Sequence, residues 1–592
     1  MSGTVAALAD LALRRPIALL AATLALLVAA VIVAAGAPDR LGVSVASVDG
    51  SSGAARPDLV VATTGTESAR SGPYRVALRV ISAQLSSDSA VASVRRGPVS
   101  RDGRSTSLIV SLAPADDAAD QRAVQRIQTE IDPGPLRVAY GGQVPALLEA
   151  RHDVSHELWK VEAVAGAVAI VLLVAALGPW LAIAPVLCAA IAIAGALAGL
   201  RLVDALGDLS LLGIAPAAVV GLALGIEVPC LMLARFGDEA ASVSHAEAVR
   251  RALAATGAGA PTLVGAAVLA TAGLLITGLD QALSIVLACL LAAGLAVGAA
   301  LLSVPALLAL AGPRSASRLS TAMGEPRLSA VPREVAAFLV RSRARTAVAA
   351  AVVVAIMAVA ALPSLHAESR SFSAADLPRT SEVAKATALA ARDTHRAGDG
   401  ERRAARASGT AAGDTQSLVD ELPLAAAISA AALALLVGIV FSPRVIVVAV
   451  VALLPAAAAC GLCVLVFQDG HLAGAIGQAR QGVLETGALA SLLACLAALG
   501  GARAVTTIGA VRGERSFGLS PLRAAEAAAA FTVPAAILAT LLAAAATGAL
   551  AGSDLYPVRE FGLAVAAGLV IDLVLVRVPL VAALSRWGGA DG

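Results

Sequence analysis

Residues 209–236 read LSLLGIAPAAVVGLALGIEVPCLMLARF, and this stretch decides the fold class of the chain. About 24 of these residues are apolar or small, and a helix of that length, rising 1.5 Å per residue, crosses a hydrocarbon core of about 30 Å. The exception is Glu227, eight residues before Arg235. A carboxyl group at that depth costs about 2.5–3.5 kcal/mol on insertion scales, so we expect it to face protein or water and to have a partner. The alternative is a side chain that reaches the headgroup layer, for which glutamate is short.

The composition indicates a membrane protein. The 592 residues are 58% hydrophobic, above the roughly 45–50% of soluble globular domains. A net charge of +2 gives no electrostatic footprint for nucleic acid. Cys460 and Cys463 have a C-x-x-C spacing, but all six cysteines lie in apolar runs, so we interpret them as buried apolar side chains. Because the HExxH, P-loop and GxSxG motifs are absent, the sequence predicts no enzyme, cofactor or metal site.

The apolar runs predict a polytopic α-helical protein with twelve transmembrane helices in two repeated halves of one plus five. The predicted spans are about 16–36, 160–178, 180–203, 209–235, 261–279, 282–312, 345–363, 422–442, 445–467, 484–511, 530–551 and 560–585. A signal peptide is the alternative for the first run, because AAGA at 34–37 resembles a cleavage site. That run is long for a signal peptide and more spans follow. Internal repeats of this kind place a site where the halves meet at mid-membrane.

Two polar segments interrupt the spans. The first has the order strand, helix, strand, strand, helix, strand, which predicts an α+β domain of the split βαβ type. Short-loop arginines such as Arg235, Arg250 and Arg251 favour cytoplasmic N- and C-termini, with both polar inserts outside. The predicted domains are 1–36 (N-terminus and helix 1), 37–157 (external α+β domain), 158–312 (helices 2–6), 313–343 (cytoplasmic Arg-rich linker), 344–363 (helix 7), 364–421 (short external insert, partly disordered) and 422–592 (helices 8–12 and a short C-terminus).

This layout, together with several motifs, resembles the MMPL branch of the RND transporter superfamily. The family's fourth helix carries a Gly-rich approach, an Asp-Tyr pair and an arginine followed by acidic residues. VLVFQDG at 464–470 is the most specific match, and LVIDLVLVRVPL at 569–580 resembles the last helix. The residues in matching positions are Gly221, Gly225, Glu227, Val228, Arg235, Asp238, Glu239, Phe467, Gln468, Asp469, Gly470, Asp572 and Arg577. The resemblance implies a transporter of the bacterial inner membrane that exports lipids or other hydrophobic molecules, with a porter-like domain at 37–157.

The chain departs from the family where the family is implied to relay protons through two Asp-Tyr pairs. The first pair is Glu227-Val228, which keeps a carboxylate and loses the phenol. Alignment of Arg512 with Arg235 puts the second pair at Ala504-Val505, one residue after Arg503. The 58-residue insert 364–421 is also too short for the family's second porter domain.

The intramembrane ionisable residues are Glu227, Arg503, Asp572 and Arg577. If helices four and ten adjoin, Glu227 can pair with Arg503. Desolvation would make Glu227 a titratable proton site, whereas a nearby arginine would hold it ionised as a fixed ion pair. A separation under about 4 Å favours the ion pair. Asp572 is a second candidate partner of Arg503. Arg577, five residues further, lies too far round an α-helix for an i,i+4 pair with Asp572, and we interpret it as an interfacial anchor.

Three functions remain open from the sequence. The first is a proton-coupled transporter of a lipid-like substrate that works through Glu227, with Arg503 and Asp572. The second is a transport-inactive scaffold or partner subunit in which Arg503 locks Glu227. The third, weaker, is a sterol-sensing-like lipid-binding bundle. The expected partners are the membrane, a hydrophobic small molecule and further chains in a homo- or hetero-oligomer. Gly221 and Gly225 form a GxxxG spacing that would permit close helix approach, although 53 glycines also produce it by chance.

Overall fold

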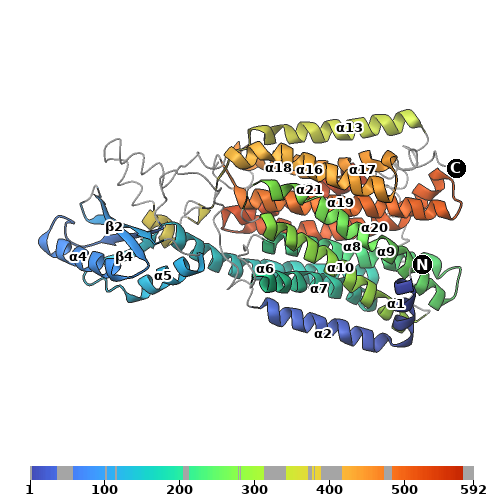
Figure 1. The fold of residues 1–592 in the computed structure, drawn as a ribbon, viewed down its shortest axis with the longest axis horizontal. Coiled ribbons are helices and arrows are strands. Elements are labelled where there is room, and N and C mark those ends of the chain that lie inside the picture. The colour runs from blue at the N-terminus through green and yellow to red at the C-terminus, as the bar shows by residue number, and fades with distance from the viewer. Residues whose placement is uncertain are drawn as a thin grey trace.

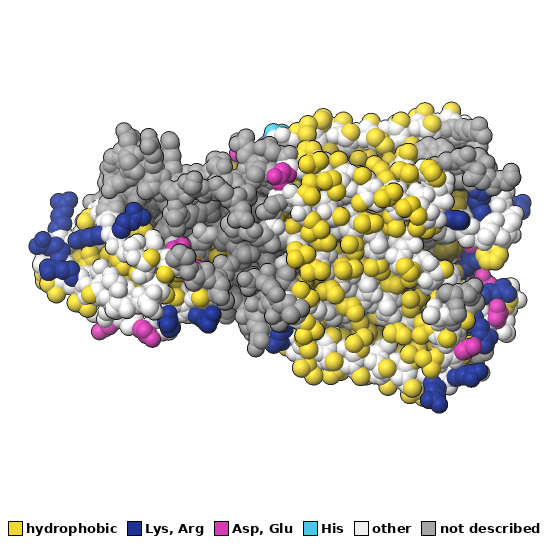
Figure 2. Space-filling model, viewed as in Figure 1, with side chains coloured by type: hydrophobic (Ala, Val, Ile, Leu, Met, Phe, Trp, Pro, Cys, Tyr) yellow, Lys and Arg dark blue, Asp and Glu magenta, His cyan; other side chains and the backbone are white. Residues whose placement is uncertain are grey.

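A bundle of long helices with a small sheet domain at one end forms the molecule (Figure 1). The structure, a computed structural model, describes residues 3–35, 58–100, 103–113, 117–204, 213–277, 279, 282–312, 342–370, 372, 376–378, 380–387, 416–471 and 483–577. Apolar side chains cover the visible face of the bundle, and Lys and Arg side chains gather at the end away from the sheet domain (Figure 2). We call these two ends of the bundle the sheet end and the opposite end.

Ten described helices are long and apolar enough to cross a membrane. They are α2 (Pro16–Ala34), α7 (Pro179–Asp204), α8 (Ile214–Glu239), α9 (His245–Leu269) with η2 (Ala272–Ile276), α10 (Ala282–Ala311), α13 (Arg343–Ala361) with η3 (Leu362–His366), α16 (Gln416–Val440), α17 (Ile446–Val451) with α18 (Leu454–Cys463) and the π-helix η6 (Val464–Gln468), α19 (Thr486–Ser516), and α20 (Pro521–Ala549). The chain is therefore a multi-pass helical membrane protein.

Two further helices lie where the second and twelfth spans are predicted. α6 (Gln143–Leu177) carries a shorter apolar stretch at 166–177, and α21 (Tyr556–Ile571) continues as the π-helix η8 (Asp572–Arg577). The arrangement of twelve helices in one-plus-five halves stays a prediction. The end of the predicted last span, 578–585, lies outside the described residues, as do the linker 313–341 and most of the insert 364–421 with its predicted disorder.

The sheet domain has the predicted order of elements. They are β1 (Leu59–Thr64), α4 (Gly72–Ser87), β2 (Val91–Val99), β3 (Ser105–Leu112), α5 (Asp117–Glu130) and β4 (Arg137–Gly141). The four strands pair antiparallel in the order β2-β3-β1-β4, the arrangement of a split βαβ fold. Alternating apolar residues of β1 and β3, such as Leu59, Val61, Leu108 and Val110, pack against the helices. The predicted α+β fold is confirmed, and its position outside the membrane stays a prediction.

The predicted start of the fifth helix at Pro261 is wrong. α9 begins sixteen residues earlier, at His245, where the Ser244 hydroxyl accepts a hydrogen bond from the Glu247 amide. The segment 236–260, which the predicted spans leave as a connection, contains the amphipathic start of α9. This part of the helix buries Ala248, Val249, Ala252 and Leu253 against the bundle. Pro261 lies inside α9. Membrane helices tolerate proline where neighbouring helices support the backbone. The sequence analysis also missed the N-terminal helix α1 (Gly3–Arg14), which packs on α9 and α10.

α8 packs against α7 so closely that a side chain at position 225 would clash with the backbone and one at position 221 would be a tight fit. A Cβ atom on Gly225 would lie 2.5 Å from the Cα of Ala189, and one on Gly221 would lie 3.0 Å from a side-chain carbon of Ile193. The predicted close approach through the GxxxG spacing is confirmed. It brings α8 to the centre of the bundle, where 89% of its apolar window is buried, as in α19.

Candidate functional site

Four charged side chains meet halfway along the bundle, and with Thr540 they form what we call the charge network. Arg503 of α19 donates from Nε to Glu227 Oε2 at 2.9 Å and from Nη1 to Asp572 Oδ2 at 2.6 Å. Its Nη2 donates to the Thr540 hydroxyl of α20 at 3.0 Å. Arg577 donates from Nη2 to Glu227 Oε1 at 2.5 Å. The four charged side chains are 2–7% exposed.

The charge network links the two halves of the chain. Glu227 belongs to α8 in the first half, whereas Arg503 and Thr540 belong to α19 and α20 in the second half. Helices α8, α19 and α20 pack against one another. The predicted proximity of Glu227 and Arg503 is therefore confirmed, and so is the contact between Asp572 and Arg503.

The interpretation of Arg577 as an interfacial anchor is wrong, because its side chain is 4% exposed and pairs with Glu227. In an α-helix, residues five apart point about 140° away from each other. Asp572 and Arg577 instead bound a π-helix, whose i→i+5 hydrogen bonds bring residues five apart nearly to one side. The π-helix therefore directs both side chains into the same part of the core. The sequence pattern does not reveal this local change of helix type.

The charge network has two carboxylates and two guanidiniums, and its formal charge is zero. Buried charges are tolerated when they are paired and hydrogen-bonded. Glu227 accepts from two guanidiniums, while the described ion pairs of Asp572 involve Arg503 alone. The 2.9 Å between Glu227 and Arg503 meets the criterion set for an ion pair, which favours the paired arrangement over an isolated carboxyl group. The Nε and Nη1 atoms of Arg577 have no hydrogen-bond partner.

The VLVFQDG motif lies at the sheet end and organises the turn after η6. Gln468 bridges this turn to the chain after α13: its Nε2 donates to the His366 carbonyl, and its Oε1 accepts from the Glu368 amide, both at 2.8 Å. Phe467 packs edge-on against Tyr556, with ring centroids 5.6 Å apart. Asp469 lies 3.2 Å from the His366 ring, and Gly470 adopts a φ of +74° that favours glycine. These four residues thus lie at the end of the predicted span 445–467.

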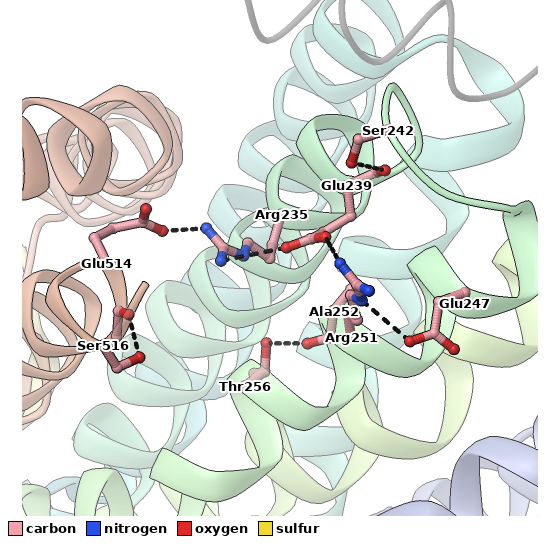
Figure 3. A network of polar contacts seen from close by, with 10 residues as sticks. Arg235, Glu239, Ser242, Glu247, Arg251, Ala252, Thr256, Glu514 and Ser516 are labelled. Atoms are coloured by element: carbon pink, nitrogen blue, oxygen red, sulfur yellow. Dashed lines mark hydrogen bonds and ion pairs between the residues drawn. The ribbon is translucent and has the colours of Figure 1, made fainter. Parts of the chain in front are cut away.

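A second network of polar contacts lies at the opposite end, where Arg235 ends the apolar part of α8 (Figure 3). Arg235 donates to Glu514 of α19 and lies 3.3 Å from Glu239. Arg251 of α9 contacts Glu239 at 3.2 Å and Glu247 at 3.1 Å. The phenyl rings of Phe517 and Phe531 each lie within 6 Å of the Arg235 guanidinium. Arg235 thus ties the two halves together a second time.

The two arginines of this network predict different stability losses. Arg235→Ala leaves the partly buried Glu514 without its partner, and we expect it to lower the free energy of unfolding by about 1.5–3 kcal/mol, the value of a hydrogen bond to a charged group. Arg251→Ala removes a half-exposed side chain from surface pairs, and its cost should be clearly smaller. Thermal denaturation of the purified variants in detergent measures both. Equal losses would contradict this ranking.

The sequence analysis missed four buried polar residues, two of them in these networks and two at the sheet end. Thr540 gave no signal, because hydroxyls are common in membrane helices. Glu514 lies two residues after Arg512 and was counted with a basic loop. Glu485 and Glu560 lie at the ends of predicted spans and were left out of the intramembrane set, yet they are 7% and 1% exposed. A search for ionisable residues within one turn of each span end would have found them.

Comparison with known proteins supports the motif assignment. Residues 75–339, somewhat less than half of the chain, match the model described as the MMPL family. Over this segment the chain is similar to the MMPL family. The match covers most of the sheet domain and the first-half helices α6 to α10, including Glu227 and Arg235. No curated protein matches the sequence.

Solved structures show a likeness in fold over nearly the full length of the chain. The structure of SecDF from Thermus thermophilus, described as a translocon-associated membrane protein, superposes with a TM-score of 0.55 at 13% identity, covering 96% of this chain and 99% of that one. A second SecDF structure, in a super-membrane-facing form, gives 0.51 at 13% identity, covering 90% and 84%. At this identity the comparison shows the fold alone. The likeness in fold therefore includes the second half of the chain.

Proposed function

We propose that this protein is a secondary transporter of a lipid or another hydrophobic molecule, and that proton binding in the charge network drives it. The MMPL family supports the transporter class. The observation that carries the coupling is the bridge that Arg503 makes between Glu227 on α8 and Asp572 on η8. Because this bridge joins the two halves at mid-bundle, a change in its charge would alter how the halves pack.

Asp572, rather than Glu227, is the carboxylate that we propose to take up the proton. Glu227 accepts from two guanidiniums, and protonating it would weaken two ion pairs at once. Protonating Asp572 weakens only its pair with Arg503, which keeps Glu227 and Thr540 as partners. The neutral Asp572 would then release η8, a π-helix whose backbone can return to α-helical pairing. Glu227 serves in this proposal as the fixed anchor.

Proton flux into liposomes tests this proposal. With the purified protein reconstituted and a pH gradient imposed, we expect internal pH to change faster than in protein-free liposomes. Asp572→Asn should reduce the flux to the protein-free level, because the amide cannot bind the proton. Asp10→Asn, at a half-exposed carboxylate of the opposite end, is the matched control and should keep the wild-type flux. Equal flux in Asp572→Asn and wild type would overturn Asp572 as the proton site.

A scaffold or partner subunit is the second candidate function. The two ion pairs of Glu227 favour this function, as does the loss of the Asp-Tyr elements. SecDF from Thermus thermophilus, which has this fold, is described as translocon-associated, and this description also favours a role within an assembly. A wild-type protein without flux that co-purifies with a second membrane chain would support this function. In either case we propose a bacterial inner membrane location, with the sheet domain outside and the arginine-rich opposite end in the cytoplasm.

A further inference from the structure

A second pair of carboxylates is buried at the sheet end, away from the charge network. Glu560 of α21 is 1% exposed, and Glu485, which precedes α19, is 7% exposed. Glu485 caps α19 by accepting from the amides of Gly487 at 3.0 Å and Ala488 at 2.6 Å. A carboxylate at a helix N-terminus is stabilised by the helix dipole, so the negative charge of this pair is placed on Glu485.

Glu560 has a different set of partners. Its Oε2 accepts from the Glu485 amide at 3.2 Å, and its Oε1 accepts from the Cys463 thiol at 3.5 Å. Among the described residues, buried Asp376 also acts on it and has the same sign of charge as Glu485. Arg559, its neighbour along the chain, donates to the Ser553 carbonyl. A second charge beside Glu485 is unfavourable, and a proton on Glu560 removes it.

Two hydroxyl groups next to this pair point to bound water. Ser369 lies on β5 (Ser369–Arg370), which pairs with β6 (Leu484–Glu485), and Thr486 follows Glu485 directly. These side chains are 1% and 3% exposed, and their Oγ and Oγ1 atoms have no hydrogen-bond partner in the described part of the chain. Buried polar groups in folded proteins are almost always satisfied, and ordered water does this where protein atoms do not. Water at these hydroxyls would lie close to Glu485, the last residue of β6.

We propose that Glu560 is a proton-exchange site at the sheet end, reached from outside through water held by Ser369 and Thr486. In the exchange, a Glu560 carboxylate accepts a proton from a hydronium ion in this water: an O–H bond forms on the carboxyl group, an O–H bond of the hydronium breaks, and a water molecule is left. The assignment deepens the proposed function and rests on it, because Glu560 lies on α21, the helix that continues as η8 with the proposed proton site Asp572. Twelve residues, about 18 Å of helix, separate the two carboxyl groups, so further water must carry the proton between them.

Infrared difference spectroscopy tests the site without any transport. The full-length protein in detergent is taken from acidic to alkaline pH, and the carbonyl stretch of a protonated carboxyl group is followed. We expect one such band to disappear in Glu560→Gln and to remain in Glu382→Gln, whose carboxylate is exposed near the same end. Absence of any band that depends on Glu560 would overturn the proposal.

Deuterium exchange tests the water. In D2O the Glu560 band should shift promptly in the wild type, and the double variant Ser369→Ala/Thr486→Val should slow this shift, because it removes the two hydroxyls that hold the water. An unchanged exchange rate would overturn the route through these residues. This variant keeps Glu560, so it also tests the proposal if Glu560→Gln does not fold.

Proton flux separates this proposal from the proposed function. If Glu560→Gln slows the flux of a wild-type protein that is active, both hold. If the wild type shows no flux while the Glu560 band is present and exchanges, the proposed function fails and the proton-exchange site remains. If Glu560→Gln carries the full wild-type flux, Glu560 is not on the proton route and the proposal fails, whatever the outcome for Asp572.

Discussion

Arg503→Met is expected to destabilise the protein by about 3–5 kcal/mol, the usual cost of removing one partner from a buried ion-pair network. The substitution takes away the guanidinium that pairs with both Glu227 and Asp572, and Asp572 then remains as a buried charge without its ion pair. Methionine fills a similar volume, so the loss reports charge rather than packing. Thermal denaturation in detergent, followed by the fraction of protein that stays monodisperse, measures the change.

The double variant Arg503→Met/Asp572→Leu is the control for this prediction. It removes one positive and one negative charge, and it leaves the Glu227–Arg577 pair in place. Replacing a whole buried ion pair by apolar residues is often neutral or stabilising. We therefore expect the double variant to recover most of the loss. If the single and double variants are equally unstable, the destabilisation comes from packing around residue 503, and the electrostatic account of the network is wrong.

Gly225→Ala is the second substitution with a large expected effect. A Cβ atom at this position would lie 2.5 Å from the Cα and 2.7 Å from the backbone nitrogen of Ala189. Backbone atoms cannot rotate away as a side chain can, so α7 and α8 must move apart. Overpacking of this kind costs about 1–3 kcal/mol. The separation would also shift Glu227, two residues further along α8, relative to Arg503.

Gly294→Ala on α10 provides the matched comparison. A Cβ atom there would meet nothing within 4 Å. Alanine is favoured over glycine inside a helix by roughly 0.5–1 kcal/mol, so this variant should be as stable as the wild type or more stable. Thermal denaturation of both variants under the same conditions gives the comparison. A Gly225→Ala protein as stable as Gly294→Ala would show that the α7–α8 contact relaxes without cost.

The positions of most helices could be predicted because their signal is local. A run of about twenty apolar residues has to be a membrane helix, since only a helix satisfies its own backbone in lipid. The boundaries of the helices were harder to predict where a helix begins in a polar segment. α9 begins in a segment that carries Arg250 and Arg251, and its apolar face there is narrow. Sequence patterning in the sheet domain, read by strand and helix periodicity, predicted all six elements in order.

The sequence by itself determined the class of protein and the split βαβ domain, and it singled out Glu227, Arg503 and Asp572, because burying a charge in lipid is costly. Only the tertiary structure decided which charge pairs with which. A pair across α8 and α19 depends on helix packing, and the pairing of Asp572 and Arg577 within one network depends on the π-helix between them. Pairing is set by distances of a few ångströms between helices far apart in the chain, and no local pattern of residues encodes these distances.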